Sequence, residues 1–273
     1  MIGKRLLFLL FCLAWVRSGT AQDTPSRSMD ELNWLEFEDL VPETVNTVLL
    51  TTGTLEPHGI TANGADNLAP VAIAAAIAED ANALIAPHIP YGYTGSLAPY
   101  PGAAHIPEEA YEAYVRAVLE GLARNRFRNI VIINGHGGPQ TAVLRKVAEE
   151  VAISQEVNTL LINWWAACAA VTERVFGNAG GHAGENETAM IQAIDPSLVK
   201  PELLERVTST PYPAAGAWSA TPFPSSIGLY RAGTGAPTDF DQKKADAYFA
   251  GVTDCVAELI RDTRRKWEAA GFE

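Results

Sequence analysis

The sequence has little of what several classes of site and partner require. It holds three cysteines with no Cys-x-x-Cys pair, so a thiolate cage for a metal ion is excluded. Basic residues are in the minority, because 20 Lys and Arg stand against 32 Asp and Glu and give a net charge of −12. A surface of this sign repels phosphates, which makes nucleic acid a poor partner. No Gly-x-Ser-x-Gly elbow surrounds Ser96 in GYTGSLAP, which argues against a Ser-His-Asp hydrolase.

Only one long apolar run is present, and it lies near the amino end. Lys4 and Arg5 precede the apolar residues 6–16, and small residues follow up to Ala21. This order is typical of a signal peptide, and the run is short for a membrane span, which needs about 20 residues. We therefore expect residues 1–21 to be cleaved after Ala21 and the mature chain to be exported, periplasmic or secreted, without membrane attachment. A leader retained as an anchor is the alternative.

Two cysteines, Cys168 and Cys255, remain after such cleavage. In an oxidising compartment they would be able to pair as a disulfide. Two unpaired, buried small side chains are the alternative, because separation in sequence says nothing about distance. The sequence leaves both states open.

Strand and helix patterns alternate along the chain, whose 273 residues are typical of one domain. We expect a flexible lead-in at 22–29 and one domain at 30–273, with Trp34, Leu35 and Phe37 packing onto it. The alternation predicts an α/β fold, a single-domain three-layer αβα arrangement with a mainly parallel central sheet. The Pro- and Gly-rich segment 208–237 has little periodicity and is interpreted as a long loop, a lid or an oligomer contact. Strands are expected at 46–52, 83–86, 129–133 and 158–163, and helices at 67–81, 107–122, 141–154 and 241–267.

Three of the five histidines lie beside Gly-rich turns in company with carboxylates. Such turns follow predicted strands or precede predicted helices, and sites in parallel sheets form at the carboxyl ends of strands. Taken singly, each acid has a plain structural reading as a helix cap, a solvated loop residue or a partner of a helix dipole. Taken together, they form a mixed nitrogen and oxygen ligand set that suits Zn²⁺ or Mn²⁺. The ligand set comprises Glu56, His58 and Asp66 in the first cluster, His136 in the second and Glu187 in the third, where His182 and Glu185 also lie.

The segments TTGTLEPHGITANGAD, INGHGGP and GGHAGENETAM resemble, in order and spacing, the hallmark segments of the creatininase family over residues 49–196. The resemblance implies a hydrolase with two divalent ions, zinc or manganese with iron as a further candidate. Glu56 and His136 would hold one ion, His58 the second, and Asp66 would bridge them. It also implies a homo-oligomer, with a hexamer as one such assembly.

The resemblance assigns further roles around the ions. His182 matches the family's loop histidine and would transfer a proton, with Glu185 as a helper. Tyr100 and His105 resemble the segment ahead of the long helix, and Trp164 and Trp165 fall where family members place aromatic residues that line the substrate pocket.

One departure bears on the substrate. The enzyme that names the family carries a carboxylate two residues after the histidine that matches His136, and here that position is Gly138. Glu187 is the nearest replacement ligand, as in family members with a His-Gly-Gly turn. We therefore expect an exported amidohydrolase that uses metal-activated water on a small non-peptide amide, linear or cyclic, other than creatinine. The alternatives are a lactonase or small-peptide peptidase on the same metals, and a non-catalytic solute-binding protein.

Overall fold

A computed structural model describes residues 26–206 and 237–272, and its strands form one four-stranded parallel sheet. Residue Thr47 pairs with Asn129, which in turn pairs with Asn158, so the three longer strands are in register and end at the same edge. Every residue of β1 and β3 is buried, as expected of central parallel strands covered on both faces. The strands are β1 (Thr47–Thr52), β2 (Ala83–Ile85), β3 (Asn129–Asn134) and β4 (Asn158–Asn163), in the order β2-β1-β3-β4.

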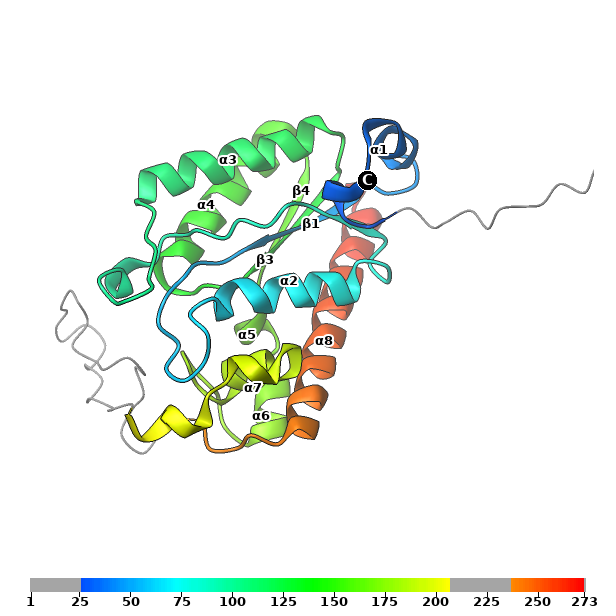
Figure 1. Cartoon of the computed structure of the whole chain (residues 1–273). Helices are drawn as coiled ribbons and strands as arrows, with labels where there is room; N and C mark the ends of the chain where they lie inside the picture. The colour runs from blue at the N-terminus through cyan, green and yellow to red at the C-terminus, as the bar shows by residue number, and fades with distance from the viewer. Residues whose placement is uncertain (1–25, 207–236, 273) are drawn as a thin grey trace, which may run out of the picture.

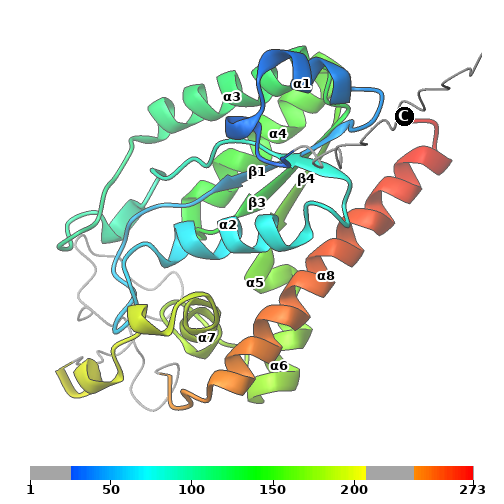
Figure 2. The ribbon, with the colours of Figure 1, turned by 45° about the vertical axis from the view of Figure 1, so that its right-hand side comes forward.

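The helices cover both faces of this sheet and include a long C-terminal one. Helices α3 and α4 lie on one side, and α2 and α8 lie on the other (Figures 1 and 2). Short 3-10 turns at Met29–Glu31, Gly95–Leu97, Pro196–Leu198 and Pro201–Arg206 join some of them. The helices are α1 (Trp34–Leu40), α2 (Ala65–Ile77), α3 (Glu108–Arg124), α4 (Gly138–Gln155), α5 (Trp164–Ala167), α6 (Ala169–Phe176), α7 (Glu185–Ile194) and α8 (Gln242–Ala269).

Side chains that alternate along the strands divide the core into two apolar layers. Leu49 and Val131 face the layer built with α2 and α8, while Leu50 and Ile132 face the layer built with α3 and α4. Helix α7 packs against α2 and α8 at the same end of the sheet as the strand carboxyl ends. The predicted three-layer αβα fold with a parallel sheet is therefore confirmed.

Most predicted elements appear with shifted ends. Helix α2 begins at Ala65, ahead of the predicted residue 67, so Asp66 lies inside its first turn and Gly64 takes the N-cap position. Helix α4 begins at Gly138 rather than residue 141, because Pro139 suits the first turn of a helix. The inclusion of Asp66 in the helix matters for the site, because its side chain is then free to point inward instead of capping.

The expectation that Trp34, Leu35 and Phe37 all pack onto the domain is wrong for two of them. Phe37 contacts Phe127 edge to face, with ring centroids 5.8 Å apart. Trp34 is 72% exposed and Leu35 54% exposed, because α1 rests on the domain through its Phe37 side. Arg27, near the end of the predicted lead-in, accepts a backbone hydrogen bond from Ile85 of β2. This part of the lead-in therefore lies against β2.

The two cysteines whose pairing the sequence left undecided form a disulfide. Cys168 and Cys255 have Cα atoms 6.0 Å apart, and their bond links the α5–α6 junction to α8. The predicted signal peptide and nearly all of the predicted loop at 208–237 lie outside the described residues. Within residues 26–206 and 237–272, no helix is long and apolar enough to cross a membrane.

Candidate metal centre

The predicted ligands converge at the shared carboxyl edge of the sheet. Glu56 and His58 follow β1, His136 follows β3, and Asp66 comes from the first turn of α2. Glycines permit this convergence: a Cβ on Gly53 would lie 2.2 Å, and one on Gly135 1.8 Å, from the backbone oxygen of Asp66. The glycines that end both strand motifs therefore let the start of α2 approach the sheet.

Asp66 lies between two histidines and faces each with a different oxygen. Its Oδ1 is 3.0 Å from Nε2 of His58, and its Oδ2 is 2.9 Å from Nδ1 of His136. The side chains of Asp66 and His58 are 5% and 0% exposed. A buried carboxylate with both oxygens directed at nitrogen donors is suited to bridge two cations.

Two groups of potential ligand atoms share Asp66. In the first, Glu56 Oε1 lies 3.2 Å from Nδ1 of His136. In the second, Glu187 Oε2 lies 3.5 Å from Nε2 of His58. The ligand atoms of each group lie within 4.8 Å of one another, as those around one ion do. The groups are Glu56 with Asp66 and His136, and His58 with Asp66 and Glu187, which brings all five predicted metal ligands together.

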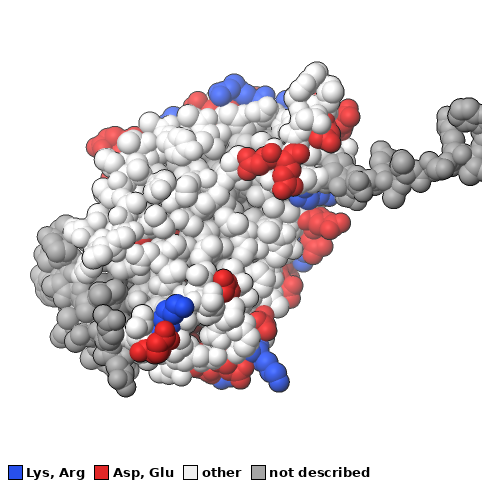
Figure 3. All heavy atoms as spheres, viewed as in Figure 1, with Lys and Arg blue, Asp and Glu red and all other residues white. Residues whose placement is uncertain are grey.

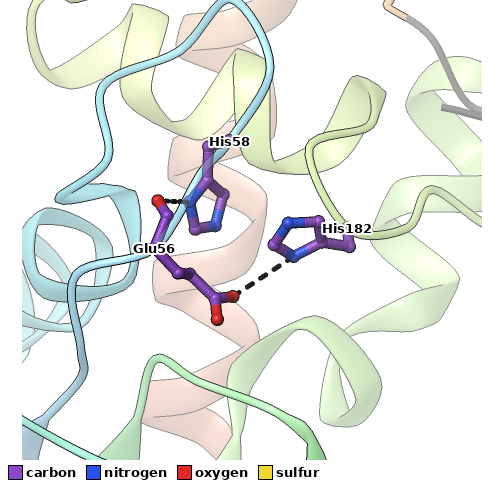
Figure 4. A group of neighbouring side chains, drawn as sticks. All are labelled: Glu56, His58 and His182. Carbon is purple, nitrogen blue, oxygen red and sulfur yellow. Dashed lines mark hydrogen bonds and ion pairs between the residues drawn. The ribbon is translucent and has the colours of Figure 1, made fainter. Parts of the chain in front are cut away.

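The imidazole of His58 is oriented for coordination. Its Nδ1 lies 3.0 Å from the backbone oxygen of Glu56 and donates to it, so Nε2 is the nitrogen that faces the carboxylates and that would offer its lone pair to a cation (Figure 4). Among the described residues, five buried side-chain atoms have no hydrogen-bond partner, and Glu56 Oε2, His58 Nε2 and His136 Nε2 are three of them. Buried polar atoms are rarely left unpaired, and cations held by Glu56 Oε2 and His58 Nε2 would satisfy both.

The electrostatics of the cluster favour added positive charge. Burial opposes protonation of His58, but the surrounding carboxylates, Asp66 first and then Glu187 and Glu56, together outweigh burial and raise the pKa of His58 to about 10. Burial acts likewise on His136, and hydrogen bonds with Asp66 and Glu56 raise its pKa to about 10. Two protons therefore occupy positions that divalent ions would compete for.

The three carboxyl groups respond differently to the same burial. Burial opposes ionisation of Asp66, yet the charge of His58 and hydrogen bonds from both histidines hold its pKa well below the ordinary value. Burial and then the charge of Asp66 raise the pKa of Glu56. Burial also raises the pKa of Glu187 to about 7. Without cations, Asp66 is therefore the most firmly ionised ligand.

His182 lies beside the two ligand groups, in the loop before α7. Its Nε2 donates to the backbone oxygen of Pro57 at 2.8 Å, and its Nδ1 lies 3.4 Å from Glu56 Oε1 (Figure 4). Burial and the charge of His58 lower the pKa of His182 to about 3, so the ring is neutral with its lone pair on Nδ1. This nitrogen is the hydrogen-bond acceptor of the ring, and His182 also forms a third group of potential ligands with Glu56 and His58.

A cavity of about 350 Å³ opens onto these side chains. Its lining includes the apolar side chains of Trp165, Leu97 and Pro139 and the polar side chains of Glu56, His182 and Glu187. Gly138 lines the cavity with φ +58 and no atom within 4 Å of a Cβ position. The cavity is therefore open at Gly138, the position where the enzyme that names the family has a carboxylate. Glu187 of α7 supplies a carboxylate oxygen to the ligand group instead.

Several residues predicted for the substrate pocket lie elsewhere. Trp164 is 2% exposed and belongs to the core, because the chain turns it inward at the start of α5 while Trp165 faces the cavity. Tyr100 and His105 are not among the described residues that line the cavity, and the His105 ring packs on Tyr93 with centroids 5.4 Å apart. Of these four residues, Trp165 alone lines the described part of the cavity.

Glu185 does not occupy the predicted helper position. Its two oxygens accept hydrogen bonds from the backbone nitrogens of Asp239 at 2.9 Å and Thr238 at 3.3 Å. The side chain leaves α7 on the side of these residues and does not line the cavity. A structural role as an anchor replaces the predicted catalytic one.

The prediction missed Asn186, which lies between two singled-out acids. Asn186 is 2% exposed and lines the cavity with Glu187. Its position in the first turn of a helix that carries a ligand was the available signal.

Comparison with known proteins agrees with the arrangement. The family model for creatininase, described as creatinine amidohydrolase, matches residues 30–260. The creatinine amidohydrolase of Pseudomonas putida is 28% identical over 199 residues, which are 66% of this chain and 75% of that protein. A mycofactocin precursor peptide peptidase of Mycobacterium ulcerans is 27% identical over 245 residues, which are 82% of this chain and 88% of that protein.

A solved structure shows the same fold. A mutant creatininase of the Zn–Zn type superimposes with a TM-score of 0.72 at 23% identity, covering 88% of this chain and 99% of that one. The family match spans most of the chain and contains all five converging ligands. The chain therefore belongs to the creatininase family of metal-dependent amidohydrolases.

Proposed function

We propose that the chain hydrolyses a small non-peptide amide at a centre that holds two divalent ions, zinc or manganese. Glu56 and His136 would hold one ion, His58 and Glu187 the other, and Asp66 both. The single observation that carries the proposal is the placement of Asp66, whose two oxygens lie 3.0 Å and 2.9 Å from different histidines. The Zn–Zn type of the creatininase structure supports the choice of metal.

One side chain, His182, would transfer the proton during hydrolysis. Divalent ions at such a centre would supply Lewis acidity, which polarises a carbonyl and lowers the pKa of water. His182 Nδ1 takes a proton from the attacking water as its oxygen bonds to the carbonyl carbon, and returns that proton to the leaving nitrogen as the C–N bond breaks. Pro57 holds the opposite nitrogen of the ring through its backbone oxygen, at 2.8 Å, and so keeps the lone pair on Nδ1.

The dimensions and lining of the cavity support a small substrate. A volume of about 350 Å³ is at the lower end of the range for small-molecule sites. Trp165 and Leu97 suit an apolar part of the substrate, such as a ring or short chain. Gly138 leaves out the carboxylate of the enzyme that names the family, which favours a substrate other than creatinine.

Cleavage of a small peptide is the second candidate. It is favoured by the mycofactocin precursor peptide peptidase, whose similarity covers 82% of this chain and 88% of its own length. The same ligands and His182 would serve this reaction, because a peptide bond is also an amide.

Metal analysis and a hydrolysis panel test the proposal together. The purified chain should hold two equivalents of metal and release amine from lactams or linear amides in preference to lactones and short peptides. Preferential cleavage of short peptides would replace the first candidate with the second, and preference for lactones would indicate a lactonase. Two bound ions without turnover of any panel member would favour a solute-binding protein.

Export is proposed on the leader and the disulfide. The order of charge, apolar run and small residues up to Ala21 is that of a signal peptide, and the Cys168–Cys255 bond suits an oxidising compartment. Mass spectrometry of the exported chain should find Gln22 as the first residue. A chain that still begins at Met1 contradicts the proposal.

We propose that the chain self-associates, on the basis of its charge distribution. No Lys or Arg occurs between Arg27 and Arg116, and Figure 3 shows a broad face with few charged side chains. Helix α2 lies on this face in the matching view, and its Val71 is 42% exposed. Light scattering should give the mass of a homo-oligomer, and Val71→Glu should lower it if α2 takes part. A monomeric mass for the unaltered chain contradicts the proposal.

A further inference from the structure

The cavity beside the proposed metal centre contains a buried amide side chain with no part in the proposed reaction. Asn186 lies in the first turn of α7, directly before Glu187, and is 2% exposed. It lines the same cavity as His182 and Trp165. Buried polar side chains are normally hydrogen-bonded, so both ends of this carboxamide are expected to have partners.

The orientation of the Asn186 side chain is determined by the loop before α7. Its Oδ1 accepts a hydrogen bond from the backbone nitrogen of Gly181 at 2.8 Å. Only the oxygen of a carboxamide can accept from an N–H group, so the two ends of the side chain are distinguished. Gly180 leaves room for it, since a Cβ there would lie 2.3 Å from Oδ1 and φ is +66.

The other end of the carboxamide remains available. No acceptor within residues 26–206 and 237–272 hydrogen-bonds Nδ2 of Asn186, while the residue lines the cavity. A carboxamide nitrogen carries two donors and accepts nothing. The side chain is neutral, so it adds a donor without adding charge beside Glu187.

We propose that Asn186 is a specificity-determining residue whose Nδ2 donates a hydrogen bond to an acceptor on the substrate. The inference rests on the proposed function, because it concerns the substrate of the same site. It narrows the substrate class to small amides that carry a second carbonyl, apart from the one that is cleaved. Such an acceptor pairs with Nδ2, whereas a CH₂ group at the same place would cover the nitrogen and leave it unpaired.

Two small lactams provide matched probes. Hydantoin and pyrrolidinone are five-membered rings of similar size, and hydantoin carries an additional carbonyl and an additional ring N–H, so the Asn186 variants decide which part of a preference the carbonyl accounts for. Their dissociation constants are measured on the metal-loaded chain by calorimetry, which does not require turnover. The unaltered chain should bind hydantoin about tenfold more tightly, the effect expected of one buried hydrogen bond.

Two substitutions separate the donor from the loop contact. Asn186→Asp keeps an oxygen for the Gly181 nitrogen and removes the donor, and Asn186→Leu removes both without adding charge. Asn178→Asp is the matched control: Oδ1 of Asn178 accepts from the Gly180 nitrogen at 2.8 Å in the same loop, but Asn178 is exposed and does not line the cavity. Metal content and thermal unfolding are recorded for each variant.

The preference for hydantoin should disappear in both Asn186 variants and persist in Asn178→Asp. A preference that survives Asn186→Asp, or an unaltered chain without any preference, overturns the assignment of Asn186. A preference that Asn186 controls, in a chain that hydrolyses no amide, supports the assignment and refutes the proposed function. The two proposals therefore fail separately.

Discussion

Nε2 of His58 lies 3.0 Å from Oδ1 of Asp66, and both side chains are almost completely buried. The other nitrogen of His58 donates to a backbone oxygen, so the ring cannot turn away from the carboxylate without losing that bond. The remaining oxygen of Asp66 faces His136 at 2.9 Å. A single side chain from α2 thus contacts both histidines that would hold metal, and its removal should affect both ions.

Asp66→Ala should therefore lose more metal than either Glu56→Ala or His136→Ala. Asp66 would serve two ions, whereas each of the others would serve one. Elemental analysis of the purified variants, loaded under the same conditions, measures the difference. Equal losses in the three variants would remove the bridging assignment of Asp66.

Glu187→Gln and His182→Gln should differ in metal content. Glu187 supplies an anionic oxygen 3.5 Å from Nε2 of His58, so its loss should reduce the content toward one ion per chain. His182→Gln should keep both ions, while turnover of the best panel amide falls by about 10²–10⁴-fold, as is typical for general acid–base groups. The reverse pattern, with an ion lost from His182→Gln and none from Glu187→Gln, would exchange the two roles.

Glu185→Ala should lose stability and retain its metal. The Glu185 carboxylate accepts from the backbone nitrogens of Thr238 and Asp239, and hydrogen bonds to a charged acceptor contribute about 1.5–3 kcal/mol each. Urea unfolding should therefore show a loss of about 2 kcal/mol or more, with metal content unchanged. A variant of unaltered stability that loses metal would contradict the anchoring role of Glu185.

Reduction of the disulfide should destabilise the fold. Cys168 and Cys255 are 87 residues apart, and the entropy of closing a loop of that length in the unfolded chain corresponds to about 4.6 kcal/mol. Unfolding midpoints with and without dithiothreitol measure the effect, and Cys168→Ala with Cys255→Ala serves as the control that no longer responds. A midpoint unchanged by reductant would show that the bond does not form in solution.

Acid should weaken the fold in part through His88. Its Nδ1 lies 2.8 Å from Oγ1 of Thr51 and its Nε2 3.0 Å from Oδ1 of Asn67, and burial lowers the pKa of the ring. The unfolded chain takes up a proton at His88 as the pH falls below about 6.5, before the folded chain does, so stability is present above that pH and lost below it. Urea unfolding from pH 8 to pH 5 should show a shallower loss for His88→Gln, and parallel curves would exclude the contribution of His88.

Much of the ligand set could be predicted from the sequence, because local patterns show where the strands end. Apolar runs end in glycine turns at both β1 and β3, and parallel strands bring such ends to one edge of the sheet. Glu56, His58 and His136 follow those runs directly. Their convergence therefore depended only on the strand pattern and on the parallel topology that it predicts.

The direction of neighbouring side chains was decided by the tertiary structure alone. Successive residues of a helix point about 100° apart, so residues one or two positions apart reach different surroundings. Trp164 enters the core while Trp165 faces the cavity, and Glu185 binds backbone nitrogens while Glu187 faces His58. The two members of each pair are the same type of residue in the same short segment, so the sequence does not distinguish them. Which member reaches the cavity is determined by the rotation at which each helix packs on the core, and that rotation depends on contacts with segments far away in the sequence.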